Sequence, residues 1–127
     1  EFKKVNCEIY AISTDTHFAH KTWHDISENI SKIEYPMIGD PTHSLTYDFD
    51  VFDENNGLAQ RGSFIIDPEG KIVVYEVNAG NVGRNAEELL RRLHACQFVY
   101  EHGNNVCPAK WKLGEKTIQT SIENVGK

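Results

Sequence analysis

Residues 67–70, with the sequence Asp-Pro-Glu-Gly, constrain the fold of this chain more than any other segment. Proline fixes φ at about −65°, which suits the second position of a type I turn, and glycine is favoured at the fourth position. The flanking runs 62–66 and 71–77 are rich in β-branched and aromatic residues, which are typical of strands. The sequence therefore predicts an antiparallel hairpin that turns at these four residues.

Upstream of the hairpin, strand and helix patterns alternate. Residues 8–12 are typical of a short buried strand, and the Ser-Thr-Asp-Thr cluster at 13–16 is typical of a helix start. The helical pattern that follows is one apolar stripe, formed by Trp23, Ile26, Ile30 and Ile33. Pro36 ends this pattern, and residues 37–40 predict a second strand. A strand, a helix and a strand in this order predict a parallel βαβ unit.

Two further helices are predicted, one on each side of the hairpin. Residues 44–52 have apolar residues at the spacing of a short helix. Asn85, with Glu88 three residues later, predicts the start of a helix that runs to about Glu101. The apolar face of that helix comprises Ala86, Leu89, Leu90, Leu93 and Cys96. Residues 106–127 have weak periodicity and predict an extended or mobile tail.

The predicted order is strand, helix, strand, helix, strand, strand, helix and tail. A parallel unit combined with an antiparallel hairpin predicts an α/β fold, with a mixed sheet sandwiched by helices. The chain has 127 residues, which is enough for one hydrophobic core but not for two. We therefore expect one domain over residues 1–102, followed by a C-terminal tail at residues 103–127.

The composition argues against several classes of protein. Apolar residues make up 39% of the chain and charged residues 25%, which is typical of globular proteins. No apolar run approaches the roughly 20 residues needed to cross a bilayer. The net charge of −6 argues against nucleic acid or an anionic membrane surface as a partner. Three cysteines without a secretory signal do not form a disulfide framework, and an odd number leaves a thiol that is reactive or pairs between chains.

Four blocks of the sequence match a known family in their order and spacing. They are 13–23, 36–41 (Pro-Met-Ile-Gly-Asp-Pro), 57–70 and 106–111 (Val-Cys-Pro-Ala-Lys-Trp). Together they resemble the typical two-cysteine peroxiredoxins of the bacterial alkyl hydroperoxide reductase type. The resemblance runs from end to end and implies a thioredoxin-like fold and a thiol-dependent reduction of hydrogen peroxide and organic hydroperoxides. The Gly-Gly-Leu-Gly insertion and Tyr-Phe ending of oxidation-sensitive members are absent, so the chain is similar to the robust bacterial subgroup.

The family motif that carries the peroxidatic cysteine has no counterpart in these residues. The chain starts without Met, directly before its first predicted strand, and the Phe-Val-Cys-Pro-type motif is expected ahead of Glu1. The resemblance thus implies a fold whose N-terminal strand and active-site helix are missing. The alternative function is a non-catalytic oligomerising fragment, inactive without its peroxidatic cysteine. We expect the 127 residues alone to fold poorly, because an apolar sheet edge would be left uncovered.

The resemblance assigns two residues to the reaction. Cys107 matches the resolving cysteine, which condenses with the sulfenic acid of the other subunit's peroxidatic cysteine; the alternative is an inert tail thiol. Arg61 matches the arginine that stabilises the thiolate and the charge developing on the peroxide oxygen; the alternative is a surface ion pair. The implied partners are a hydroperoxide and either a flavoprotein disulfide reductase subunit or thioredoxin. The implied assembly is a cytoplasmic homodimer, in a ring of five dimers, without a cofactor.

The remaining candidates receive structural interpretations. Cys96, on the apolar face of its helix, and Cys7, at the start of a strand, are expected to act as small hydrophobes. Residues 80–83 are interpreted as a turn, because they lack the lysine and the glycine pattern of an anion-binding loop. No metal is expected, because no acid or cysteine is spaced to complete a site with the three histidines that share a helix face. These are His17, His20 and His24.

Overall fold

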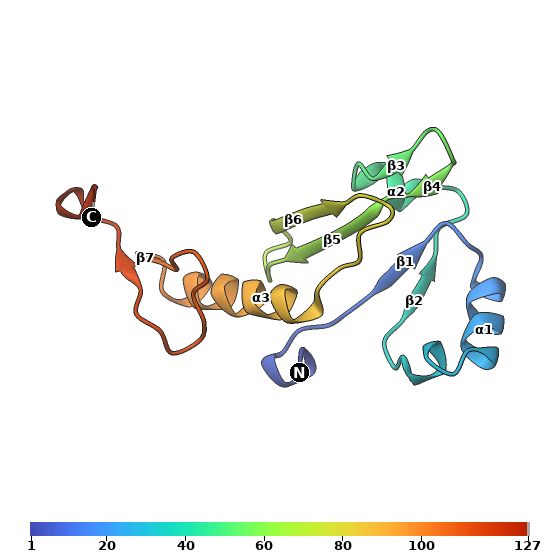
Figure 1. Cartoon of the computed structure of the whole chain (residues 1–127), viewed down its shortest axis with the longest axis horizontal. Helices are drawn as coiled ribbons and strands as arrows, with labels where there is room; N and C mark the ends of the chain where they lie inside the picture. The colour runs from blue at the N-terminus through green and yellow to red at the C-terminus, as the bar shows by residue number, and fades with distance from the viewer. Residues whose placement is uncertain (127) are drawn as a thin grey trace. The chain divides into compact units, whose positions relative to one another are not determined.

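The computed structural model describes residues 1–126 (Figure 1). By their contacts, these residues form two compact units. The first unit comprises Glu1–Gly62 and Val77–Gly83, and the second comprises Ser63–Glu76 and the chain from Arg84. The helices are α1 (His17–Ile26), α2 (Ser44–Asp48) and α3 (Ala86–Glu101), with 3₁₀ turns at Lys3–Val5, Ile30–Lys32 and Ile122–Asn124. The strands are β1 (Ala11–Ser13), β2 (Met37–Gly39), β3 (Phe52–Asp53), β4 (Leu58–Ala59), β5 (Arg61–Ile66), β6 (Ile72–Asn78), β7 (Asn105–Val106) and β8 (Ile118–Gln119).

The predicted parallel unit is confirmed at the start of the chain. Strands β1 and β2 pair in parallel with Ile12 opposite Ile38, and α1 lies between them in sequence as the crossover that parallel strands need. The strand β1 begins three residues later than the predicted run 8–12. Gly39 ends β2 where a Cβ atom would lie 2.8 Å from the carbonyl oxygen of Asp15. The absence of a side chain at this position therefore lets the start of α1 pack directly against β2.

The helix α1 is shorter than the predicted apolar stripe. It begins at the Thr16 cap, whose hydroxyl accepts a hydrogen bond from the Ala19 N–H, and it ends at Ile26. Ser27 then has an extended backbone, and its hydroxyl accepts from the Ile30 N–H at the start of a separate 3₁₀ turn. The prediction that one helix continues through the stripe to Ile33 was therefore wrong, because a local side-chain hydrogen bond competes with the helix.

The buried face of α1 is formed by a residue outside the predicted stripe. His20 is 5% exposed, whereas Trp23 is half exposed and Ile26 is 78% exposed. The His20 Nε2 atom lies 2.6 Å from the Ser13 hydroxyl oxygen, so the helix is held to the end of β1 by a polar contact. The Ser13 hydroxyl donates its single hydrogen to Asp15, at 2.8 Å, and Nε2 is therefore the donor to Ser13.

The helix α2 also ends before its predicted limit. It stops at Asp48, and the left-handed backbone of Asp50 (φ 54°) turns the chain before the buried Val51. No side chain caps the first turn at His43. Instead, the buried carboxylate of Asp40 accepts hydrogen bonds from the N–H groups of Leu45 and Thr46 and from the Thr46 hydroxyl. Asp40 thus connects the end of β2 to the start of α2.

Two hairpins follow. The short one pairs β3 with β4 in an antiparallel register, with Phe52 opposite Ala59. The predicted hairpin is confirmed: β5 and β6 are paired neighbours joined by residues 67–70. In its turn, Asp67 Oδ1 accepts hydrogen bonds from the N–H groups of Glu69 and Lys71, at 2.9 Å each, and Gly70 has a φ of 83°. Positive φ favours glycine, so this residue type is needed at the fourth position.

The helix α3 has the boundaries that the sequence predicts. Asn85 caps it, because its side-chain oxygen accepts hydrogen bonds from the N–H groups of Glu87 and Glu88, and the helix ends at Glu101. Leu93 is its buried apolar residue. Within the described residues, no helix is long and apolar enough to cross a membrane.

The C-terminal segment is more structured than predicted. Strands β7 and β8 pair in an antiparallel register, and the segment folds back beside α3 (Figure 1). Trp111, at 2% exposure, is the most deeply buried large side chain described. The expectation of an extended or mobile tail was therefore wrong, because the burial of Trp111 depends on contacts with α3 that periodicity does not reveal. The domain boundary after residue 102 stays a prediction.

Parallel and antiparallel pairing both occur among the described strands, but in separate two-stranded sheets rather than in the one mixed sheet that the sequence predicts. The strands described in residues 1–126 form four two-stranded sheets: β1–β2, β3–β4, β5–β6 and β7–β8. The first is parallel, and the pairs β3–β4 and β7–β8 are antiparallel. The chain is therefore an α/β fold.

Candidate functional site

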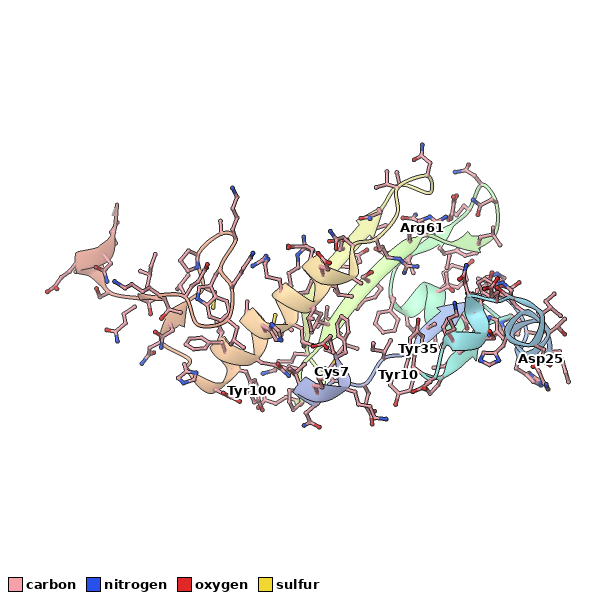
Figure 2. The ribbon with its side chains drawn as sticks, turned by 60° about the horizontal axis from the view of Figure 1, so that its bottom comes forward. Cys7, Tyr10, Asp25, Tyr35, Arg61 and Tyr100 are labelled. Atoms are coloured by element: carbon pink, nitrogen blue, oxygen red, sulfur yellow. The ribbon has the colours of Figure 1, made fainter. Side chains whose placement is uncertain are left out.

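Arg61 is the first residue of β5 and is exposed (Figure 2). Its Nε atom donates a hydrogen bond to the carbonyl oxygen of Gly80, at 2.6 Å. Its two Nη atoms have no hydrogen-bond or ion-pair partner among residues 1–126. The alternative interpretation of Arg61 as a surface ion pair therefore has no partner in the described chain. One side of the guanidinium is fixed, and the other can bind an anionic or partly charged oxygen.

The loop that holds Arg61 is itself held by two hydrogen bonds. The Val82 N–H donates to the carbonyl of Ala79, at 2.9 Å, which closes a turn around Gly80. The side chain of Asn78, the last residue of β6, donates to the carbonyl of Gly83, at 3.0 Å. Residues 80–83 thus form a turn, as predicted, and they provide the carbonyl group that orients Arg61.

Cys107 lies in the second unit, directly after β7 and half-buried. Its Sγ atom lies 3.9 Å from the carbonyl oxygen of Ala95, on α3. Burial raises the pKa of the Cys107 thiol, and the nearby Arg91 guanidinium partly opposes this effect. The thiol was predicted to lie in an extended tail, and the structure instead places it against a helix.

Trp111 and Arg91 hold the segment that contains Cys107. The Trp111 ring contacts Phe98 with centroids 5.2 Å apart, and its indole N–H donates to the carbonyl of Glu115, at 3.0 Å. Arg91 Nη1 donates to the carbonyl of Trp111, at 2.9 Å. Besides the contact between Cys107 Sγ and Ala95, an aromatic contact and a hydrogen bond from a charged donor therefore hold the segment to α3.

The other two cysteines are also free thiols. Cys96 lies on α3 and Cys7 lies before β1 rather than inside a strand, and both are half-buried. Burial raises the pKa of each thiol. Their interpretation as small hydrophobes stays a prediction.

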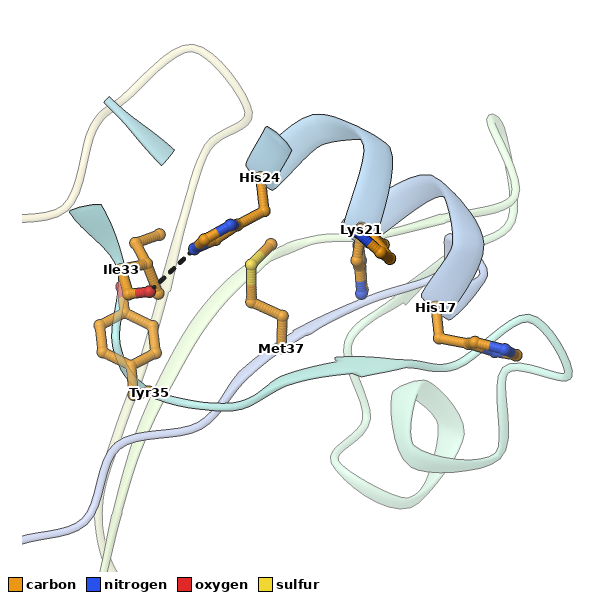
Figure 3. Close-up of a pocket in the computed structure, with 7 residues that line it drawn as sticks. His17, Lys21, His24, Ile33, Tyr35 and Met37 are labelled. Atoms are coloured by element: carbon orange, nitrogen blue, oxygen red, sulfur yellow. Dashed lines mark hydrogen bonds between the residues drawn. The ribbon is translucent and has the colours of Figure 1, made fainter. Parts of the chain in front are cut away.

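The three histidines of α1 lie at an open hollow of about 240 Å³ (Figure 3). The hollow is lined by His17, His20, Lys21, His24, Ile33, Tyr35 and Met37. His24 Nε2 donates to the carbonyl of Ile33, at 3.1 Å, and His20 is bound to Ser13. Among residues 1–126, no group of three or more His, Cys, Asp or Glu side chains is arranged to hold a metal ion.

Comparison with known proteins identifies the family. The model of the AhpC/TSA family matches residues 1–75, and the model of the C-terminal domain of 1-Cys peroxiredoxin matches residues 95–126. This chain belongs to the AhpC/TSA family. A curated member, alkyl hydroperoxide reductase C of Bacillus subtilis, is 53% identical over 98% of this chain and 67% of its own length.

Solved peroxiredoxin structures confirm the predicted thioredoxin-like fold. The crystal structure of Enterococcus faecalis AhpC has a TM-score of 0.81 and is 53% identical, over 84% of this chain and 64% of that chain. The reduced 2-Cys peroxiredoxin of Plasmodium vivax has a TM-score of 0.90 and is 29% identical, over 96% of this chain and 64% of that chain. The chain thus spans a little under two thirds of these solved structures.

The two predicted site residues of this peroxiredoxin chain belong to different units. Arg61 lies in the first and Cys107 in the second. The groups that hold them were not predicted from the sequence. They are Gly80 and Asn78 for Arg61, and Arg91 and Trp111 for Cys107. The spacing of Glu88 and Arg91 on α3 was a usable signal, because residues three positions apart are neighbours on a helix.

Proposed function

We propose that this chain is part of a thiol-dependent peroxidase that reduces hydrogen peroxide and organic hydroperoxides. The similarity to alkyl hydroperoxide reductase C over almost the whole chain supports this reaction class. The observation that carries the proposal is the Arg61 guanidinium, fixed by Gly80 with its Nη atoms free for an oxygen ligand.

The proposed reaction begins when a peroxidatic thiolate attacks one oxygen of the hydroperoxide. The O–O bond breaks, the sulfur is oxidised to a sulfenic acid, and the second oxygen takes a proton and leaves as water or an alcohol. By family resemblance, we expect this first thiol ahead of Glu1 and not among Cys7, Cys96 and Cys107. The Nη atoms of Arg61 donate to the thiolate and to the peroxide oxygens while negative charge develops on them.

Cys107 is proposed as the resolving thiol. Its sulfur attacks the sulfenic sulfur, a disulfide forms, and the sulfenic oxygen leaves as water. The half-buried position of Cys107 and its raised pKa suit a thiol that stays protonated until it is released to react. A dithiol reductant then reopens the disulfide, and we propose a flavoprotein disulfide reductase subunit or thioredoxin for this role.

We further propose a cytoplasmic homodimer that assembles as a ring of five dimers. The exposed apolar side chains of α1 support self-association through this helix. Phe18 is 73% exposed, and Trp23 and Ile26 are also exposed. A monomeric protein rarely leaves a group of large apolar side chains in water.

The substitution Cys107→Ser tests the resolving role in the intact protein. We expect peroxide turnover supported by a disulfide reductase to fall at least about tenfold, because no disulfide forms for the reductase to open. A small thiol should restore turnover, because it can reduce the sulfenic acid directly. The matched control is Cys96→Ser, which should retain turnover. Full reductase-supported turnover in the Cys107 variant would contradict the proposal, and turnover no faster than free cysteine in the unmodified protein would favour the non-catalytic alternative.

A further inference from the structure

Arg91 joins α3 to the segment that carries Cys107. Its Nε and Nη2 atoms bind the two carboxylate oxygens of Glu88, at 2.8 and 2.9 Å, in a bidentate ion pair. This pair fixes the plane of the guanidinium, because two parallel hydrogen bonds allow only one orientation. The remaining Nη1 atom is thereby directed at the carbonyl of Trp111, to which it donates at 2.9 Å.

The contact at Trp111 lies four residues after Cys107, in the same segment. The Trp111 N–H donates to the carbonyl of Pro108, at 3.0 Å, so the residues after Cys107 form a tight turn. The same face of α3 presents three groups to this turn at helical spacing: the Arg91 guanidinium, the Ala95 carbonyl beside Sγ, and the Phe98 ring beside Trp111. Displacing Trp111 would therefore also remove Cys107 from its position beside Ala95.

The neighbouring Arg92 shares part of this network but not the contact with the Cys107 segment. Its Nε atom donates to Glu88, at 2.9 Å, and its Nη1 atom pairs with Glu76, on β6. No hydrogen bond or ion pair joins Arg92 to the described residues after α3. The helix thus carries two adjacent arginines with one shared partner, and only one of them holds the cysteine segment.

We propose that Arg91 is a positioning residue for Cys107: its hydrogen bond to the Trp111 carbonyl holds the Cys107 turn against α3 and limits how often the thiol is released to react. To form a disulfide, the Cys107 sulfur must approach the other sulfur to the bonding distance of about 2.05 Å. A thiol packed beside Ala95 is not free to make that approach. The consequence for catalysis rests on the proposed function, in which Cys107 is the resolving thiol. The effect of Arg91 on release does not depend on that function.

Arg91 acts on Cys107 in two ways, by holding the turn and by its positive charge. The loss of each shifts the pKa of the thiol in the opposite direction, so the two effects can be separated. Burial is the larger influence and raises the pKa of the thiol, whereas the charge of Arg91 lowers it. Release of the turn removes the burial, so the pKa should fall towards the ordinary thiol value. Loss of the Arg91 charge without release should instead raise the pKa further.

The test is the alkylation of reduced intact protein by iodoacetamide, with each cysteine peptide followed by mass spectrometry at several pH values. In Arg91→Gln, we expect Cys107 to react about tenfold faster, because the lost bond had a charged donor and its loss opens the turn. Its apparent pKa should fall. The variant Arg91→Lys keeps a charged donor but lacks the planar guanidinium that binds Glu88 and Trp111 together. Its Cys107 should therefore react at an intermediate rate.

Two controls separate release of the turn from general loosening. Arg92→Gln breaks the shared Glu88 network without touching Trp111, and it should leave the Cys107 rate within twofold of the unmodified protein. Cys7, which lies before β1 in the first unit, reports on general loosening and should keep its rate in every variant. Equal acceleration by Arg92→Gln, parallel acceleration of Cys7, or a Cys107 rate that stays constant or falls in Arg91→Gln would overturn the proposal.

A second measurement connects release to the reaction. In peroxide-driven turnover, Arg91→Gln should accumulate several-fold less sulfinic acid on the peroxidatic cysteine, because a freer Cys107 captures the sulfenic acid sooner. If alkylation of Cys107 is faster but the accumulation of sulfinic acid is unchanged, Arg91 holds the turn without affecting catalysis. That result would overturn the proposed catalytic consequence. Because alkylation needs no peroxide, it tests the release of Cys107 even if Cys107→Ser retains full turnover.

Discussion

The guanidinium of Arg61 is fixed by Gly80 through a single hydrogen bond of 2.6 Å from Nε to the carbonyl oxygen. The bond joins the first residue of β5 to the turn that follows β6, and both residues belong to the first unit. It orients the guanidinium while leaving both Nη atoms free to donate. An arginine held in this way needs little reorganisation to bind a charged oxygen, which is the requirement for stabilising a transition state.

Replacing Arg61 tests whether its guanidinium, held at Nε and free at both Nη atoms, acts in the reaction. We expect Arg61→Lys to lower kcat/KM for hydrogen peroxide at least about 100-fold, because lysine keeps the charge but cannot donate to Gly80 and to an oxygen ligand at once. Steady-state peroxide consumption by the intact protein measures the effect. Lys71→Gln removes an exposed cation from the same hairpin and should leave kcat/KM unchanged. An equal loss in both variants would indicate that only the overall charge matters.

Asn78 should affect catalysis through Arg61, because its side chain closes the loop that contains Gly80. We expect Asn78→Ala to lower kcat about three- to tenfold with a smaller change in KM, since misplacing a catalytic group costs more in the transition state than in the ground state. The control is Asn81→Ala, in the same loop, whose side chain has no hydrogen-bond partner among the described residues. Equal losses in the two variants would show that the loop matters only as a whole.

Glu88 links the stability of the α3 region to pH. The Arg91 hydrogen bonds, aided by Arg92, lower the pKa of this carboxyl from about 4.5 to about 2. The folded carboxylate is therefore favoured, and its contribution to stability is complete above pH 4.5 and is lost as the pH falls through about 2.

We expect the unmodified protein to be more stable than Glu88→Gln at neutral pH, with a difference that narrows steadily from pH 4.5 to pH 2. Urea unfolding across this range measures the difference. Glu87→Gln, next to it, removes a carboxylate whose side chain forms no hydrogen bond or ion pair in the described structure, and it provides the reference. A difference that does not depend on pH would show that the ion pair does not stabilise the folded state.

Asp40 and Thr46 form a buried polar pair, with the Thr46 hydroxyl 2.7 Å from the carboxylate of an aspartate that is 4% exposed. We expect Asp40→Ala to lower the free energy of unfolding by about 2–3 kcal/mol, because the hydrogen bonds to the first turn of α2 are lost and their donors remain buried. Adding Thr46→Val should then cost less than it does alone, with a coupling of about 1 kcal/mol. Asp48→Ala, at an exposed position of α2, should change stability by less than about 0.5 kcal/mol. Strict additivity of the first two substitutions would contradict a direct interaction.

The elements predicted correctly are those whose boundaries depend on neighbouring residues. The turn at 67–70 and the Asn85 cap each use side chains within four positions of the backbone groups that they bind. The wrong predictions concern segments in which a local sequence pattern favoured one structure and a contact in the folded chain favoured another. The apolar stripe favoured one helix to Ile33, but the Ser27 hydroxyl starts a new turn, and His20 takes the buried position.

In the candidate site, too, part was predictable from residue types and part was visible only in the folded chain. The residue types around Arg61 and Cys107 were enough to select both as candidates, but not to show what surrounds them. Gly80 lies 19 positions from Arg61, and Trp111 lies 20 positions from Arg91. Hydrogen bonds over such separations leave no periodic signal in the sequence.

The sequence alone determined the α/β class, the parallel βαβ unit, the central hairpin, the limits of α3 and the family resemblance, because each depends on residue types at short, regular spacing. The tertiary structure decided that Arg61 is oriented by a carbonyl group, and that the C-terminal segment is held against α3 by Arg91 and the burial of Trp111. The physical reason is that a carbonyl oxygen is present at every residue. Which of them meets a guanidinium is fixed only when the chain has folded.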